Sequence, residues 1–266
     1  MTFEPAIFPA AESSPLCWSF TFVEGQLLLG EGDEDLAPGA LIDAGVRHYL
    51  GRLGGLDAWA QCAQAVPPGW RRVPLRAAMM ALPAAQMEVA ARAAQVIEWD
   101  RTHRFCGVCG TATERVEHER ARRCPACAHA AYPRITPAMM VLVWREGQVL
   151  LARAPHFAKG MYSALAGFVE AGETLEQCVE RETAEEVSVR IADLRYVGSQ
   201  SWPFPHSLML AFTAQWTSGE IVPQAGEIED AQWFPLDGLP SIPPRFSISG
   251  HLIRDTVALL SEGRTP

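Results

Sequence analysis

The alternation of apolar and polar positions divides the first hundred residues into strand-like and helix-like segments. The apolar run at 16–23, the turn dipeptide Glu24-Gly25 and the run at 26–29 predict a β-hairpin. Apolar residues then recur at every third or fourth position over 84–103, which predicts a helix. No pattern typical of catalysis occurs here, so we expect a packing or dimerisation domain.

The pattern after residue 137 indicates mixed strands around two helices. The strand-like runs are 138–144, 148–153, 194–199, 208–216 and 231–234. Helical spacing follows Thr174 and returns at 252–261, where Leu252, Val257 and Leu260 would face inward. We therefore expect a layered α/β (α+β) sandwich in this part of the chain.

Composition and charge narrow the class of protein. The 266 residues are 48% hydrophobic and 20% charged, which is typical of a folded domain. A net charge of −9 weighs against a main role in wrapping nucleic acid, because neutralising phosphates requires clustered Lys and Arg. We expect no secretory signal at the start of the chain, which carries Glu4 and Glu12, and the apolar runs are shorter than the roughly 20 residues of a membrane span. We expect a cytoplasmic protein that binds no membrane.

Two C-x2-C pairs separated by fourteen residues indicate a metal site. The four cysteines are Cys106, Cys109, Cys124 and Cys127. Each pair can lie on a tight turn, so that four thiolates surround Zn²⁺ at about 2.3 Å. Because four cysteines leave no position for water, this zinc would be structural. His103, His118 or His129 could replace a ligand, and the arginines nearby leave open that the ribbon binds nucleic acid.

Three glutamates are spaced to share one face of a helix. Thr174 and Gln177 form a capping box, which predicts that the helix starts there. Glu182, Glu185 and Glu186 follow at positions i, i+3 and i+4. Their repulsion becomes attraction if Mg²⁺ or Mn²⁺ binds between them, and such an ion can neutralise a pyrophosphate and position a water. The alternative is a solvated acidic face.

The segment 167–189 resembles the Nudix box, G-x5-E-x7-R-E-U-x-E-E-x-G-U, in which U is aliphatic. The residues on motif positions are Gly167, Glu173, Arg181, Glu182, Glu185, Glu186 and Val189. Arg181 could pair with Glu173 and hold the loop to the helix. Thr183 replaces an aliphatic residue, and Ser188 replaces the last glycine, where a left-handed backbone would cost about 1–2 kcal/mol.

The resemblance implies the Nudix α/β/α sandwich and hydrolysis of a nucleoside diphosphate linked to another group. The residues it assigns to catalysis are Glu173, Arg181, Glu182, Glu185 and Glu186. It implies that Glu182 and Glu186 are metal ligands and that Glu185 is a ligand or the base. The backbone carbonyl of Ala166 and the carboxylate of Glu227 fall on further metal positions of the family.

The segment 199–207, SQSWPFPHS, resembles the S-Q-P-W-P-F-P-x-S signature of the NADH pyrophosphatase branch, with Ser201 replacing the first proline. Pro203 and Pro205 fix φ and so hold Trp202 and Phe204 rigidly beside a flat ligand. The candidate substrate-binding residues here are Gln200, Ser201, Trp202, Pro203, Phe204, Pro205, His206 and Ser207. The polar side chains of this segment can supply hydrogen bonds to the ligand.

The resemblance extends to the order of domains: an N-terminal α+β domain (1–102), a zinc ribbon (103–135) and a Nudix domain (136–266). It implies that Tyr132 and Phe168 flank an adenine, with core packing as the alternative role. The implied reaction cleaves NADH or NAD⁺ into NMNH or NMN and AMP with Mg²⁺ or Mn²⁺, in a homodimer with composite sites. Alternatives are removal of an NAD cap from RNA 5′ ends, hydrolysis of another nucleoside diphosphate derivative, and a non-enzymatic binding module.

Overall fold

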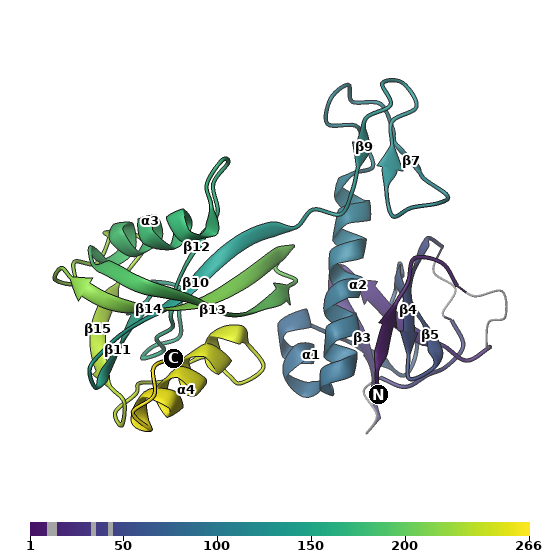
Figure 1. The fold of residues 1–266 in the computed structure, drawn as a ribbon. Helices are drawn as coiled ribbons and strands as arrows, with labels where there is room; N and C mark the ends of the chain where they lie inside the picture. Colours follow the sequence, from purple (N-terminus) through teal and green to yellow (C-terminus); the bar gives the residue numbers. More distant parts are fainter. Residues whose placement is uncertain (10–14, 33–35, 42–44) are drawn as a thin grey trace. The chain divides into compact units, whose positions relative to one another are not determined.

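Figure 1 shows the fold in a computed structural model, which describes residues 1–9, 15–32, 36–41 and 45–266. The chain forms two units. Residues 1–134 and 203–206 make up the first, and residues 135–202 and 207–266 the second. Within the described ranges, every helix is too short or too polar to cross a membrane.

The first unit contains a six-stranded sheet with the order β1-β4-β5-β2-β3-β6. Its strands are β1 (Phe3–Pro5), β2 (Trp18–Val23), β3 (Gln26–Gly30), β4 (Arg47–Leu53), β5 (Leu56–Cys62) and β6 (Trp70–Val73). Strands β2 and β3 form the predicted hairpin, and Glu24 and Gly25 at its turn have φ of 49° and 77°. Positive φ at both turn residues matches the right-handed twist of the strands.

Two helices follow this sheet, α1 (Leu75–Ala81) and α2 (Ala84–Thr102). The second confirms the predicted helix, and its buried Val89, Ala90 and Ala93 belong to a helix that contacts β2, β4 and β5. The unit ends in a small sheet of β7 (Glu114–Arg115), β8 (Arg122–Arg123) and β9 (Ala130–Ala131). The predicted N-terminal α+β region and the ribbon are therefore both present.

The second unit contains a six-stranded sheet in which β10 is central. Its strands are β10 (Thr136–Arg145), β11 (Gln148–Arg153), β12 (Leu165–Phe168), β13 (Arg190–Trp202), β14 (Ser207–Ser218) and β15 (Asp230–Pro235). The order is β13-β14-β10-β11-β15, and β12 also pairs with β10. The β10–β14 pair is parallel and the other pairs are antiparallel.

Alternate residues of β10 enter two separate cores. Met139, Val141 and Val143 pack on the side of helix α3 (Leu175–Val187), whereas Met140 and Leu142 pack on the side of helix α4 (Ile248–Ser261). The buried helical residues in these cores are Cys178, Val179 and Val187 of α3 and Leu252 and Ile253 of α4. A strand covered on both faces is apolar on both, which explains the unbroken apolar run in β10. The predicted α/β/α sandwich is confirmed.

Helix α4 begins four residues before the predicted 252–261. Its N-cap is Ser247, whose side chain accepts a hydrogen bond from the Gly250 N–H at 3.1 Å. Leu252 is fully buried, and Val257 and Leu260 pack against the same core, as predicted.

Candidate active site and zinc ribbon

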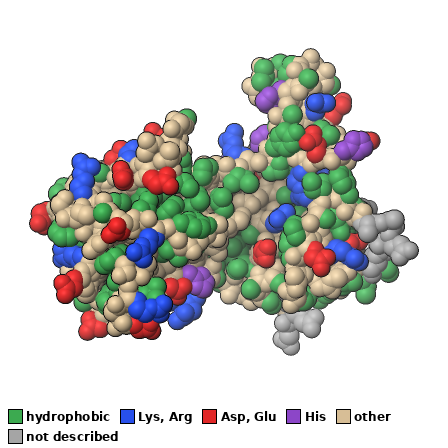
Figure 2. All heavy atoms as spheres, viewed as in Figure 1, with side chains coloured by type: hydrophobic (Ala, Val, Ile, Leu, Met, Phe, Trp, Pro, Cys, Tyr) green, Lys and Arg blue, Asp and Glu red, His purple; other side chains and the backbone are tan. Residues whose placement is uncertain are grey.

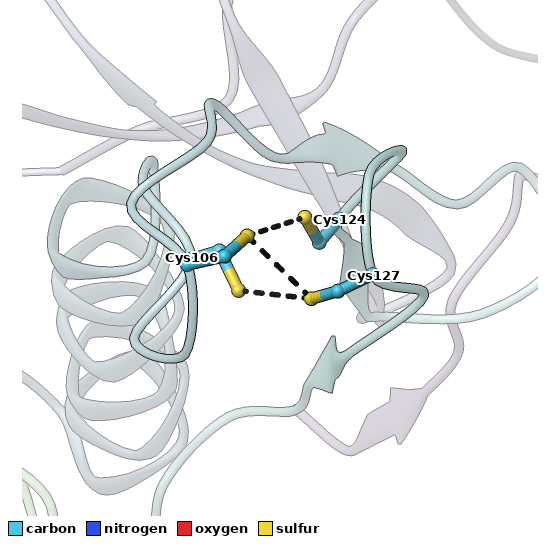
Figure 3. Close-up of side chains that lie close together, drawn as sticks. Cys106, Cys124 and Cys127 are labelled. Atoms are coloured by element: carbon cyan, nitrogen blue, oxygen red, sulfur yellow. Dashed lines mark hydrogen bonds between the residues drawn. The ribbon is translucent and has the colours of Figure 1, made fainter.

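Four cysteine thiols converge in the ribbon, and Figure 3 shows the labelled Cys106, Cys124 and Cys127 pointing toward one another. The Sγ–Sγ distances are 3.6 Å for Cys106–Cys127, 3.5 Å for Cys109–Cys124 and 3.6 Å for Cys109–Cys127. Ligands about 2.3 Å from a tetrahedral centre would be about 3.8 Å apart. The thiols therefore fit one zinc ion with every coordination position taken by sulfur.

Each cysteine pair lies on a tight backbone turn. The Gly110 N–H donates to the Cys106 carbonyl and the Ala128 N–H to the Cys124 carbonyl, both at 2.9 Å. Gly110 and Ala128 take up the positive φ of these turns, at 76° and 61°. Among the described residues no histidine belongs to the thiol cluster, and a ring nitrogen of His103 instead lies 2.8 Å from the Trp99 carbonyl.

Helix α3 starts at the predicted capping box. The Gln177 N–H donates to the Thr174 hydroxyl at 3.2 Å, and the Thr174 N–H donates to the Gln177 side-chain oxygen at 2.9 Å. These two bonds satisfy backbone donors that the first helical turn leaves unpaired. They fix the helix start, and with it the direction of the acidic side chains.

Arg181 joins the helix to the loop before it. Its Nε and Nη2 donate to the two oxygens of Glu173 at 2.7 and 2.9 Å, and Nη2 also donates to the Phe168 carbonyl at 3.0 Å. The Arg181 bonds and a backbone N–H hold the pKa of Glu173 at about 2. The predicted Arg181–Glu173 pair is present, and Arg181 Nη1 also lies 3.0 Å from both Glu182 and Glu185.

The acids of α3 are not a uniformly solvated face, although Figure 2 shows acidic side chains gathered over α3. The side chain of Glu185 is 51% exposed and that of Glu182 only 13%. Glu186 is buried, and its Oε2 has no hydrogen-bond partner. Burial, with Glu182 and Glu227 nearby, raises the pKa of Glu186 to about 8. A buried carboxyl oxygen without a partner beside further acids is what a site for a hard cation requires.

Strand β12 supplies the floor of this acid cluster. The backbone N–H of Ala166 donates a hydrogen bond to Glu186, which places Ala166 beside the cluster. Gly167 has an ordinary φ, but a Cβ there would overlap the Glu182 carboxylate. The absence of a side chain at Gly167 therefore makes room for Glu182, whereas Gly172, with φ of 86°, provides the turn in the loop before the helix.

A loop before β15 closes the acid cluster. The Gln224 N–H donates to the Glu186 carbonyl at 2.9 Å, and the Val222 N–H donates to the Val187 carbonyl at 3.1 Å. These bonds bring the loop to the end of α3, and Glu227 on it contributes to the raised pKa of both Glu182 and Glu186. The sequence pattern did not single out Gln224, whose side-chain Oε1 is buried without a partner.

The two candidate stacking aromatics are exposed, so their side chains are not core residues. Tyr132, in the first unit, is 54% exposed and donates its hydroxyl hydrogen to Glu119 at 2.8 Å. Phe168, in the second unit, is 57% exposed at the end of β12. Large exposed rings can stack on a flat base.

The segment 199–207 covers the end of β13, the tip of the hairpin and the start of β14. The Gln200 amide bonds to the chain at the start of α4: its Nε2 donates to the Phe246 carbonyl at 2.8 Å, and its Oε1 accepts from the Ile248 N–H at 2.7 Å. Trp202 stacks on Phe246 with 6.2 Å between ring centroids. The remaining candidates in the segment are Ser201, Pro203, Phe204, Pro205, His206 and the buried Ser207.

Three models of known families match three successive regions of the chain. The NUDIX domain model matches residues 134–255, the NADH pyrophosphatase zinc ribbon domain matches 101–132, and the NADH pyrophosphatase-like rudimentary NUDIX domain matches 20–99. The three matches follow the order predicted from the sequence.

Two relatives align in sequence with most of this chain. A Deinococcus radiodurans protein described as an NAD-capped RNA hydrolase NudC is 44% identical over 253 residues, covering 93% of this chain and 90% of its own length. One of the same description from Chromobacterium violaceum is 60% identical over 182 residues, covering 68% and 69%. The crystal structure of a NUDIX hydrolase from Nitrosomonas europaea has a TM-score of 0.53 at 24% identity and covers 61% of this chain and 94% of its own. That likeness concerns the fold.

Proposed function

Because the chain belongs to the Nudix hydrolase family, in its zinc-ribbon NADH pyrophosphatase branch, we propose that it hydrolyses the pyrophosphate bond of NADH or NAD⁺. Water adds to one phosphorus, the bridging P–O bond breaks, and the products are AMP and NMNH or NMN. The observation that carries this proposal is the acid cluster, in which the buried Glu186 has an unpartnered oxygen beside Glu182 and Glu227.

The acid cluster fits a hard divalent ion, Mg²⁺ or Mn²⁺. Glu182, Glu186 and Glu227, with the Ala166 carbonyl, would hold it. When bound, the ion offsets the charge of the pyrophosphate and acidifies a water. Glu185 is more exposed than its neighbours and is our candidate for a further ligand or for the base that accepts the proton of water.

The remaining polar groups of the box position this cluster. Arg181 neutralises part of the repulsion between Glu182 and Glu185 and ties the loop at Glu173 to the helix. With this clamp in place, the acids are arranged before substrate arrives, which lowers the reorganisation needed during reaction.

We propose that exposed aromatic side chains bind the dinucleotide. Tyr132 and Phe168 are free to stack on the adenine, an interaction worth about 1–3 kcal/mol per base. The segment 199–207 supplies the rest of the site, with Trp202, Phe204 and the two prolines as rigid apolar contacts. The polar residues Gln200, Ser201, His206 and Ser207 are candidates for hydrogen bonds to the ligand.

We further propose a cytoplasmic homodimer with composite sites, in which the ribbon holds one structural Zn²⁺ per chain. The resemblance to the NADH pyrophosphatase branch supports this proposal. Light scattering coupled to gel filtration should give twice the 29.1 kDa chain mass. A monomer that retains full activity would contradict the composite site.

A second candidate substrate is the NAD cap of an RNA, because the relatives from Deinococcus radiodurans and Chromobacterium violaceum are described as NAD-capped RNA hydrolases. The chemistry is the same, but the adenosine carries an RNA chain. We expect the ratio of kcat/KM on NAD-capped RNA and on NADH to decide which substrate the site prefers.

The reaction is tested by product analysis with NADH and Mn²⁺. We expect AMP and NMNH from the wild type, a loss of about 100-fold or more in kcat for Glu186→Gln, and little change for Glu180→Gln. Glu180 is a matched control because it is an exposed acid of the same helix. Absence of AMP from both NADH and NAD⁺, or full activity in Glu186→Gln, would reject the proposal.

A further inference from the structure

A small cavity in the first unit is lined by positive groups rather than by balanced pairs. Its volume is about 70 Å³, and it lies where β4, the end of α2 and the ribbon meet. The polar and aromatic residues that line it are His48, Tyr49, Trp99, Arg115, Glu119 and Arg120. A water molecule occupies about 30 Å³ of liquid, so the cavity has room for a larger polar group.

Arg120 brings a charge into this cavity and donates to backbone carbonyls, not to a carboxylate. Its Nη2 donates to the Tyr49 carbonyl at 2.7 Å and to the Ala6 carbonyl at 3.3 Å, whereas its Nη1 is buried with no partner. Burial, followed by the nearby Arg92 and Arg115, lowers the pKa of Arg120 to about 10. A buried guanidinium with an unused donor is costly unless an acceptor binds it.

The second guanidinium, Arg115, also lacks a carboxylate. Its Nη2 donates to the Arg47 carbonyl at 2.9 Å and to Nδ1 of His48 at 2.8 Å. Accepting that bond makes the His48 ring neutral, with its hydrogen on Nε2, 3.7 Å from Asp100. Asp100 in turn pairs with Arg122 at 2.6 Å and is not available to the cavity.

One acid, Glu119, is among the described residues that line the cavity. Its Oε2 accepts a hydrogen bond from the Tyr132 hydroxyl at 2.8 Å, whereas Arg115 and Arg120 donate to backbone carbonyls and to His48. Two guanidinium groups therefore face a single carboxylate that is bonded elsewhere. The cavity carries a net positive charge.

We propose that this cavity binds a small oxyanion, a phosphate group that is either free or carried on a nucleotide. Two guanidinium groups with donors to spare match the several acceptor oxygens of phosphate, and partial burial removes the water that would weaken the attraction. The bound anion would also strengthen the packing between the ribbon and the sheet. The site does not depend on the proposed hydrolysis.

Calorimetric titration of the zinc-containing full chain with inorganic phosphate tests this site. Mg²⁺ and Mn²⁺ are omitted so that phosphate is not bound through a metal, and chloride at equal ionic strength is the reference. We expect saturable phosphate binding, weakened about tenfold or more in Arg115→Gln and in Arg120→Gln. Arg123→Gln removes the same charge from an exposed position of β8 and should change the affinity less than twofold.

The result is decided by comparing phosphate with AMP as the ligand, and by comparing the two cavity variants with Arg123→Gln. Weakening of AMP binding by the same two variants would show that the anion can be carried on a nucleotide, and binding of phosphate alone would indicate a free anion. No saturable phosphate binding, or equal weakening in all three variants, would overturn the proposal. Should loss of the Tyr49 contact unfold Arg120→Gln, as judged by circular dichroism, Arg115→Gln decides alone.

Discussion

The acid cluster depends on neighbours that offer no ligand of their own, and Gly167 is the clearest case. A methyl group there would overlap the Glu182 carboxylate, because β12 passes directly beneath it. We expect Gly167→Ala to lower kcat/KM by about 100-fold through displacement of Glu182. Gly198→Ala is the control, since a Cβ at that position meets nothing within 4 Å. Equal activities of the two variants would refute this role.

The raised pKa of Glu186 predicts how the free energy of unfolding changes with pH in protein free of Mg²⁺ and Mn²⁺. Its pKa is about 8 in the folded chain against an ordinary value of 4.5, so between these values the folded state holds more protons than the unfolded state. The free energy of unfolding must then fall as pH rises through this window. Thermal melts from pH 5 to 8 should show the decline in wild type and a smaller one in Glu186→Gln. Parallel curves for the two proteins would contradict the buried carboxyl.

Helix α3 ends with a strained residue that the sequence pattern anticipated. Ser188 occupies the left-handed region with φ of 60° and ψ of 21°, where the family motif has glycine. We expect Ser188→Gly to raise the free energy of unfolding of the second unit by about 1 kcal/mol. Ala258→Gly, at an exposed position inside α4, should lower it by about 0.5–1 kcal/mol, because glycine is unfavourable inside a helix. Denaturant unfolding measures both, and a destabilised Ser188→Gly would show that the serine makes a compensating contact.

Elements with a strong local signal were predictable, and those defined by distant partners were not. Helix α3 has a capping box, so its start was found, and β10 and β11 have long apolar runs around a turn, so both strands were found within two residues of their ends. Strand β12 has four residues, two of them Ala and Gly, and exists because it pairs with β10. Strand β4 was missed for another reason: it forms a local hairpin with β5, in which Leu53 pairs with Leu56, and the turn signal of Gly54 and Gly55 was overlooked.

The residues of the candidate active site were predictable where they lie close together in the sequence. The motif spacing identified the acids and the Arg181–Glu173 pair, which lie within one helical segment and the loop before it. Gln224 was not found because only backbone hydrogen bonds between separate elements bring it to Glu186. The clearance above Gly167 likewise depends on how β12 and α3 pack, which no spacing rule describes.

At the scale of the whole molecule, zinc binding by the ribbon is a source of stability separate from the two sheets. The four thiols fit one zinc ion, and residues 103–134 contain only two-residue strands to hold them otherwise. We expect about one zinc per chain by metal analysis and a large fall in Tm on chelation, because zinc binding contributes directly to folding. Cys124→Ser should lose the zinc and Cys17→Ser should keep it. Full zinc content in Cys124→Ser would contradict the site.

The central claim is that the acids of α3 gather divalent ions for pyrophosphate hydrolysis. Its most direct test is a titration of Mn²⁺ followed by electron paramagnetic resonance, in which only unbound ions give the free-ion signal. The account predicts saturable binding by the wild type and by Glu180→Gln, tightened by NADH, and a loss of at least about tenfold in affinity for Glu186→Gln. Unchanged Mn²⁺ binding by Glu186→Gln, with or without NADH, would contradict it.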